Sequence, residues 1–147
     1  MLIASGVLCM AAGTTAQAAP IPVPPNDSTQ CSAWSTSIPF MRYRECLVHT
    51  PASLGANVRT GLQVINATHT DRYVHVVAET INRTNDGDYV TTASCDARVK
   101  PGNSAAATCW DYSRFVWSGT AVFGQGTLTD ISSGQTGTAA RSPTYWP

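Results

Sequence analysis

Charged residues are scarce in this chain. Only 12% of its 147 residues are charged, and nine basic side chains balance nine acidic ones, so the formal net charge is zero. Lys100 is the only lysine. Surfaces that bind nucleic acid or an anionic membrane concentrate Lys and Arg. The composition therefore argues against both kinds of partner.

Recognisable catalytic and metal-binding motifs are also missing. The cysteines have no Cys-x-x-Cys spacing, and there is no Gly-x-Ser-x-Gly nucleophile elbow. Glu45 and Glu79 are the only glutamates, and glycosidase chemistry would need such a pair to face one cleft. His69 and His75 would form a zinc-binding pair only if a turn placed them on adjacent strands. We therefore predict a non-enzymatic protein with no metal and no cofactor.

The apolar runs are too short for a membrane span, which takes about 20 residues. The run from Leu2 to Ala12 is followed by Ala16-Gln17-Ala18, which has small residues at the two positions that a signal peptidase reads. We interpret residues 1–18 as a secretory signal peptide, although no basic residue precedes the run. A buried N-terminal helix or strand is the alternative. The first interpretation predicts an extracellular protein.

Cleavage of that signal would remove Cys9 and leave an even number of cysteines. An even number in an exported chain favours disulfides. Four cysteines allow three pairings, and we favour the two that close short local loops. The first of these is Cys31–Cys46. The second is Cys95–Cys109, whose members are equidistant from Gly102 and would lie opposite each other in a hairpin that turns there.

The segment that follows the signal, residues 19–30, is rich in proline. Proline fixes φ and lacks a backbone donor, so we expect an extended arm. Ile21 and Val23 place two branched apolar side chains on this arm. They are candidate partner-binding residues if the arm docks on another subunit, and otherwise the arm is a linker.

Residues 31–131 have the composition of a β-domain. Runs rich in Val, Ile, Thr and aromatic residues are separated by turn residues, and apolar residues recur at every second position. The expected strands are 58–70, 73–82, 89–99, 106–112, 115–123 and 126–131. Turns are expected at 85–88 and 100–103, and Gly124-Gln125-Gly126 is expected to form a bulge or turn. The predicted fold is all-β, an antiparallel β-sandwich or small barrel braced by two disulfides.

Aromatic residues gather near the end of this domain. Trp110, Tyr112, Phe115 and Trp117 fall within eight positions. They form either the core or an exposed platform that suits a sugar ring or a protein partner.

The remaining candidates for partner binding are two arginines and the C-terminal tail. Arg42 and Arg44 would share one side of a strand, as a solvated face or as an interface. Residues 132–147 are rich in Gly, Ser and Thr and are expected to form a loop. Tyr145 and Trp146 end this tail, where they either pack back on the domain or anchor a partner.

These observations favour a secreted protein-binding module, with carbohydrate as a possible ligand. A secreted protease or glycosidase inhibitor is the alternative, in which Met41, Arg98 or Lys100 would enter the pocket of a protease. An inhibitor should present a protruding loop beside a disulfide, whereas an adaptor should present arms and patches at its termini.

The chain also resembles small exported two-disulfide proteins of actinobacteria. The resemblance rests on Arg44-Glu45-Cys46 downstream of Cys31, and on Cys109-Trp110 leading to Trp117-Ser118-Gly119. Among these proteins it resembles the adaptor subunit of umbrella-like toxin particles. That resemblance implies a bridge between a large toxin polypeptide and a lectin-like subunit, docked through the proline-rich arm and exposed strand edges.

Overall fold

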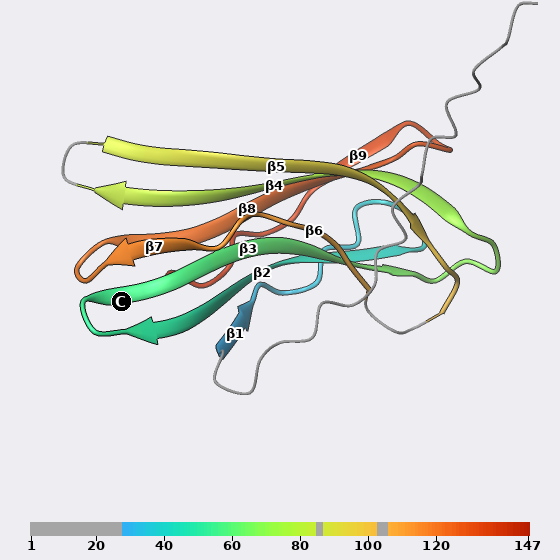
Figure 1. Cartoon of the computed structure of the whole chain (residues 1–147). Coiled ribbons are helices and arrows are strands. Elements are labelled where there is room, and N and C mark those ends of the chain that lie inside the picture. The colour runs from blue at the N-terminus through green and yellow to red at the C-terminus, as the bar shows by residue number, and fades with distance from the viewer. Residues whose placement is uncertain (1–27, 85–86, 103–105) are drawn as a thin grey trace, which may run out of the picture.

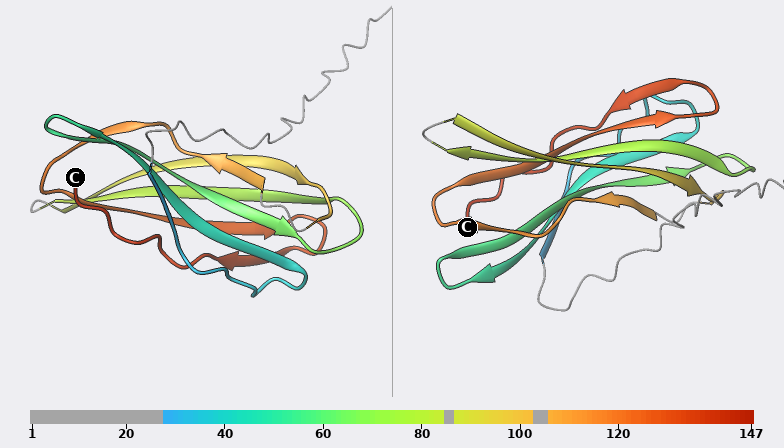
Figure 2. Two further views of the ribbon diagram at one scale, coloured as in Figure 1. Left: turned by 90° about the horizontal axis from the view of Figure 1, so that it is seen from below. Right: turned by 45° about the horizontal axis from the view of Figure 1, so that its top comes forward.

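The protein is a sandwich of two antiparallel β-sheets, shown as a ribbon in Figures 1 and 2. The computed structural model describes residues 28–84, 87–102 and 106–147. One sheet has five strands in the order β1-β2-β3-β6, with β7 also paired to β3, and the other has four in the order β5-β4-β8-β9. The all-β antiparallel prediction is therefore confirmed.

The strands differ widely in length. The four longest are β2 (Met41–Ala52), β3 (Gly55–Asn66), β4 (Arg72–Thr84) and β5 (Gly87–Val99). The others are β1 (Ser28–Cys31), β6 (Ala106–Trp110), β7 (Arg114–Trp117), β8 (Ala121–Asp130) and β9 (Gln135–Thr138).

Alternation of side chains along the strands builds the core between the sheets. In β4, Val74, Val76 and Ala78 are fully buried, whereas the residues between them are partly exposed. Leu62 and Val64 of β3, in the five-stranded sheet, belong to the same apolar cluster as Val74 and Val76. This period of two is the signal that predicted the strands.

The predicted hairpin between β4 and β5 is present. The two strands pair along their whole length, and Thr84 pairs with Gly87 next to the turn. Gly87 has a φ of 126°, a conformation that favours glycine. Asn85 and Asp86 lie outside the described residues.

The turn predicted at 100–103 does not close a hairpin. β5 belongs to the four-stranded sheet and β6 to the five-stranded sheet, so the chain crosses from one sheet to the other after Lys100. Pro101 forms a bridge with Asn66, and the amide of Gly102 donates to the carbonyl of Asn66. Cys95 and Cys109 therefore face each other across the sandwich and do not lie on paired strands.

Two local predictions near β8 are wrong. The run 115–123 is not one strand, because a turn at Gly119, with a φ of 87°, separates β7 from β8. Gly124-Gln125-Gly126 is not a bulge but the regular middle of β8, in register with β4. The glycines are needed there because the carboxyl group of Glu45 packs on the strand: a Cβ at Gly124 would lie 2.7 Å from Glu45 Oε1.

The C-terminal tail is part of the sandwich and not a free loop. It forms β9 and then continues beside β8, where Ala139 donates to the carbonyl of Gly126. Val122 and Tyr145 exchange two backbone hydrogen bonds farther along. The chain end consequently lies near the β2–β3 and β7–β8 turns (Figure 1).

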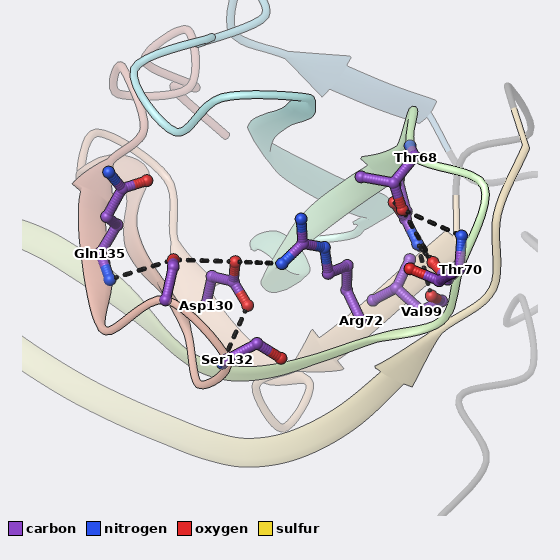
Figure 3. A network of polar contacts seen from close by, with 9 residues as sticks. Thr68, Thr70, Arg72, Val99, Asp130, Ser132 and Gln135 are labelled. Carbon is purple, nitrogen blue, oxygen red and sulfur yellow. Dashed lines mark hydrogen bonds and ion pairs between the residues drawn. The ribbon is translucent and has the colours of Figure 1, made fainter.

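The opposite end of the sandwich is held by buried polar side chains, shown in Figure 3. Asn66 is fully buried; its Nδ2 donates to the carbonyls of Thr70 and Val99, and its Oδ1 accepts from the amide and hydroxyl of Thr68. Asp130 accepts from Arg72 at 3.2 Å and from the β8–β9 turn. These hydrogen bonds thus hold the β3–β4, β5–β6 and β8–β9 connections at this end.

Candidate functional site

Two arginines and a tryptophan stack on the outer face of β2. Alternation along the strand sends Met41, Tyr43 and Glu45 inward and Arg42 and Arg44 outward. Trp34, from the β1–β2 connection, lies over this outer face. The Cζ atoms of Arg42 and Arg44 are 5.4 Å and 4.4 Å from the centre of the Trp34 ring. The two predicted arginines therefore share one aromatic partner.

A second stack lies farther across the same sheet. The Cζ of Arg59 on β3 is 5.3 Å from the centre of the Trp110 ring. Trp110 pairs with Gly61, and a Cβ at Gly61 would lie 2.5 Å from Trp110 Cδ2 and Cε3. Glycine is therefore required at this position to seat the indole. We call Trp34, Arg42, Arg44, Arg59 and Trp110 the arginine–tryptophan face.

Buried hydrogen bonds next to Trp110 hold this part of the face in place. The amide of Asp111 donates to the carbonyl of Thr60, and Asp111 Oδ2 accepts from the hydroxyls of Thr80 and Thr91 at 2.9 Å and 2.6 Å. Burial raises the pKa of Asp111, but these hydroxyls and the Tyr112 amide outweigh that effect and leave the pKa below its usual value. The ionised carboxylate thus ties the end of β6 to the other sheet.

The arginines of the arginine–tryptophan face lack acidic partners. In the ranges that the structure describes, no carboxylate forms an ion pair with Arg42, Arg44 or Arg59. Arg44 Nε donates only to Gln63 Oε1, at 3.0 Å. The arginines of β4 and β5 are all paired, as Arg72–Asp130, Arg83–Asp88 and Arg98–Asp71. The uncompensated positive charge on strands therefore lies on the outer face of the five-stranded sheet.

The aromatic cluster is mostly a surface feature and not core. Tyr112 is 80% exposed and Trp117 is 62% exposed, whereas Trp110 is half-buried. Phe115 and Trp117 are in edge-to-face contact, with ring centres 5.1 Å apart. Of the two readings that the sequence left open, the structure favours the exposed one.

Other exposed apolar residues lie near Trp117, at the end of the sandwich where the chain terminates. They are Leu54 in the β2–β3 turn, Tyr89 at the start of β5, Phe115 of β7 and Trp146 of the tail. The amide of Ser118 donates to the carbonyl of Leu54, and that of Gly119 donates to the carbonyl of Pro147. We call Leu54, Tyr89, Phe115, Trp117 and Trp146 the aromatic end.

A groove of about 200 Å³ opens at the aromatic end. It is lined by three of the aromatic rings together with polar side chains: Tyr89, Phe115, Trp117, Asn82, Thr84 and Thr120, with Val116 at its base. Asn82 Oδ1 is buried and has no hydrogen-bond partner among the described residues. The groove thus combines flat rings with polar side chains.

The two C-terminal candidates have different positions. Tyr145 packs against the apolar cluster around Leu47 and stacks on His49, with ring centres 3.8 Å apart. Trp146 is 64% exposed. Tyr145 is therefore a structural anchor of the tail, and Trp146 remains available to a partner. Ile21 and Val23 lie outside the described residues.

The cysteines form one disulfide and one close thiol pair. Cys31 and Cys46 are bonded between β1 and β2, with Cα atoms 4.1 Å apart, which confirms that prediction. Cys95 and Cys109 are thiols in hydrogen-bonding contact. That hydrogen bond lowers the pKa of Cys95 and raises the pKa of Cys109. Cys95, which is also the more exposed of the two, is the sulfur that would attack an incoming disulfide.

The glutamates do not form a catalytic pair. Glu45 is buried between the sheets and packs on Gly124 and Gly126, whereas Glu79 alternates onto the outer face of β4. Burial raises the pKa of Glu45 to about 8; the nearby Thr60 hydroxyl lowers it in part, and the charge of Glu79 raises it further. Neither oxygen of Glu45 has a hydrogen bond of regular geometry to any described residue.

The remaining sequence candidates separate in space. His75 contacts Asp96, at 2.6 Å between Nδ1 and Oδ1, rather than a second histidine. The described part of the chain contains no cluster of three or more metal-ligating residues, and no helix in it is long and apolar enough to cross a membrane. Met41 is 1% exposed, so it is not available to fill the pocket of a protease.

Trp34 and Arg59 were missed at the sequence level. Trp34 reaches the face because the β1–β2 connection runs beside β2, where Ser35 bridges Tyr43, and Arg59 reaches it because the register of β2 against β3 aligns the outer faces of these strands. An Arg-x-Arg pair with a tryptophan eight residues upstream was the one visible signal. No family model, curated protein or solved structure matches the chain.

Proposed function

We propose that this protein is an exported, non-enzymatic binding module whose arginine–tryptophan face binds an acidic surface of a partner protein. One observation carries the proposal: Arg42, Arg44 and Arg59 are stacked on tryptophan rings and have no described carboxylate partner. The Cys31–Cys46 disulfide is compatible with an extracellular location.

The chemistry of this face suits protein recognition. Tryptophan and arginine dominate the energetics of protein interfaces. Stacking already restricts each guanidinium group, so less side-chain entropy is lost when it binds. A carboxylate on the partner would accept two parallel hydrogen bonds from one guanidinium, which adds geometric specificity.

A bridging role needs a second surface, and the aromatic end is our candidate for it. Its rings lie at one end of the sandwich, apart from the stack of Arg42 and Arg44 on Trp34. Two separate surfaces on a rigid domain are what an adaptor requires. We extend the proposal to an adaptor of an extracellular toxin particle, in line with the resemblance described above.

Capture from the culture supernatant of the producing bacterium tests this proposal. We expect the immobilised wild-type chain to retain a partner that R44A and W34A retain at least about tenfold less well. R141A is the matched control, because Arg141 also stacks on an aromatic ring, Phe123, but lies beside the other sheet.

Salt dependence provides a second readout of the same experiment. Exposed charge pairs are screened at high ionic strength, so retention should fall as salt rises. A partner retained equally by wild type, R44A and W34A would contradict the proposed face.

Carbohydrate binding is a second candidate function, favoured by the groove at the aromatic end. Sugar rings stack on exposed aromatic faces, and Thr84 and Thr120 line the same groove with hydroxyls that can bond a sugar hydroxyl. A glycan array probed with wild type and W117A tests it: a glycan bound by wild type and lost in W117A supports it, and no bound glycan rejects it.

A further inference from the structure

The β5 strand is an unusually long open edge. All thirteen of its residues pair with β4 without a register shift, so the strand contains no bulge. No described strand pairs with its other side, and none of its residues is a proline. Natural sheets usually shorten, kink or cover such edges, because their free backbone groups can pair with another chain.

The sandwich is also open along the middle of this edge. A cleft of about 450 Å³ lies between β5 and β6. Its β5 side consists of Thr92, Ala93, Ser94 and Cys95, and Cys109, Trp110 and Tyr112 line the opposite side. Ala93 and Cys95 pack on the core but remain partly exposed. A further strand beside β5 would cover them.

The charges of β5 are complementary to those of the same strand running in the opposite direction. If two copies pair antiparallel about a two-fold axis at Ala93, Asp88 of each copy lies opposite Arg98 of the other. Both side chains are exposed on the outer face. An axis at Thr92 would instead oppose Asp88 to Asp96, and an axis at Asp96 would oppose that residue to itself. Opposite charges on facing strands stabilise pairing, and like charges destabilise it.

We propose that two copies of this chain associate through antiparallel pairing of their β5 strands, centred on Ala93. The four-stranded sheets then join into one continuous sheet, and the middle of each cleft is covered by the strand of the other copy. The ion pairs Arg83–Asp88 and Arg98–Asp71 within each copy are kept. Each contact between Asp88 and the Arg98 of the other copy therefore joins two existing ion pairs. The pairing strands belong to the other sheet from the arginine–tryptophan face, although Trp110 of that face also lines the cleft, and their pairing does not depend on the proposed function.

Charge reversal tests both the association and its register. Sedimentation velocity of the full chain, expressed in an exporting host, should show a dimer whose population rises with concentration and falls with salt. D88R and R98D should each weaken dimerisation about tenfold, because each places two like-charge pairs in the interface. The double variant D88R/R98D should regain the affinity of wild type within about threefold. T138D is the control, since Thr138 is exposed on β9 at the opposite edge of the sheet, and a charge added there should leave the dimer unchanged.

A readout on the wild-type protein covers the case in which a reversed variant fails to fold. Backbone amides on the open edge of β5 should exchange with deuterium more slowly as protein concentration rises. A monomer at every concentration up to about 1 mM would overturn the proposal, as would β5 amides that exchange at the same rate throughout. A dimer insensitive to both reversals, or not restored in the double variant, would also overturn it.

Discussion

The indole ring of Trp110 lies directly on the backbone of Gly61, at a point where any β-carbon would overlap the ring. This contact seats one of the two tryptophans of the arginine–tryptophan face. We expect G61A to displace Trp110, lower the stability of the domain by about 1–3 kcal/mol through overpacking and reduce partner binding. Chemical unfolding measures the loss of stability, and a red shift of tryptophan emission reports the displacement of Trp110.

N57A is the control for this prediction, because Asn57 is exposed on the same face of β3. It should leave both the emission maximum and the stability close to wild type. If G61A matched N57A in both measurements, Trp110 would not depend on Gly61 for its position.

Burial of Glu45 should make the stability of the protein decrease as the pH rises. Its pKa is about 8 in the folded state against an ordinary value of 4.5, so between these values the unfolded chain loses a proton that the folded chain keeps. The loss should reach on the order of 4–5 kcal/mol by pH 8 and be absent below about pH 4.5. E45Q should flatten the profile of unfolding free energy between pH 5 and 8, by about that amount.

E79Q is the control for E45Q, because Glu79 is half-exposed whereas Glu45 is buried. E79Q should keep the decline with pH, shifted only slightly because its charge contributes to the raised pKa of Glu45. A decline that persists unchanged in E45Q would contradict our account of the buried carboxyl.

If the protein is exported, as we propose, the thiols of Cys95 and Cys109 should be oxidised to a disulfide. They are already in contact across the sandwich, and Cys95 has the lowered pKa that favours exchange. Closing a loop of this length should add about 3 kcal/mol of stability. Thiol titration of the unfolded secreted protein should therefore find no free thiol from this pair, and C95A/C109A should unfold at a lower denaturant concentration.

A reducing agent distinguishes the contributions of the two disulfides to stability, because Cys31–Cys46 forms independently of this pair. C95A/C109A should still respond to a reducing agent through that bond. Secreted wild-type protein that retains two titratable thiols would show that the pair stays reduced.

Asn66 should be among the most sensitive polar positions in the chain. N66A would remove four hydrogen bonds, among them the one that Asn66 donates to the carbonyl of Val99 in the interior. We expect a loss of about 2–4 kcal/mol, measured by thermal or chemical unfolding. T136A, at an exposed hydroxyl pair near the same end, should cost under about 1 kcal/mol. Equal effects of the two substitutions would reject the role assigned to Asn66.

Local sequence patterns were sufficient to predict β3, β4, β5 and β6, but not β1, β9 or the extent of β2, nor how the strands are distributed between two sheets. The alternation in β4 and β5 and the glycine at their turn identified a hairpin. The same kind of turn residues at 100–103 connect two sheets, because the bridge to Asn66 redirects the chain. That bridge joins residues far apart in sequence and leaves no local trace.

The arginine–tryptophan face was only half predictable for the same reason. Arg42 and Arg44 were visible because they alternate on one strand. Trp34 comes from a connection, and Arg59 reaches the face through the pairing of β2 with β3. The bulge or turn predicted at Gly124-Gln125-Gly126 was wrong for the same reason, because the side chain that requires glycine there is Glu45 on the opposite sheet.

The single lysine has a practical consequence that follows from its place at the end of β5. Lys100 is separated by the length of that strand from Tyr89 and the groove, and no other side chain carries a primary amine. A dye or solid support coupled to this amine would sit at the far end of the sandwich. Molecules attached in that way would all present Trp117 and Trp146 outward, in one orientation.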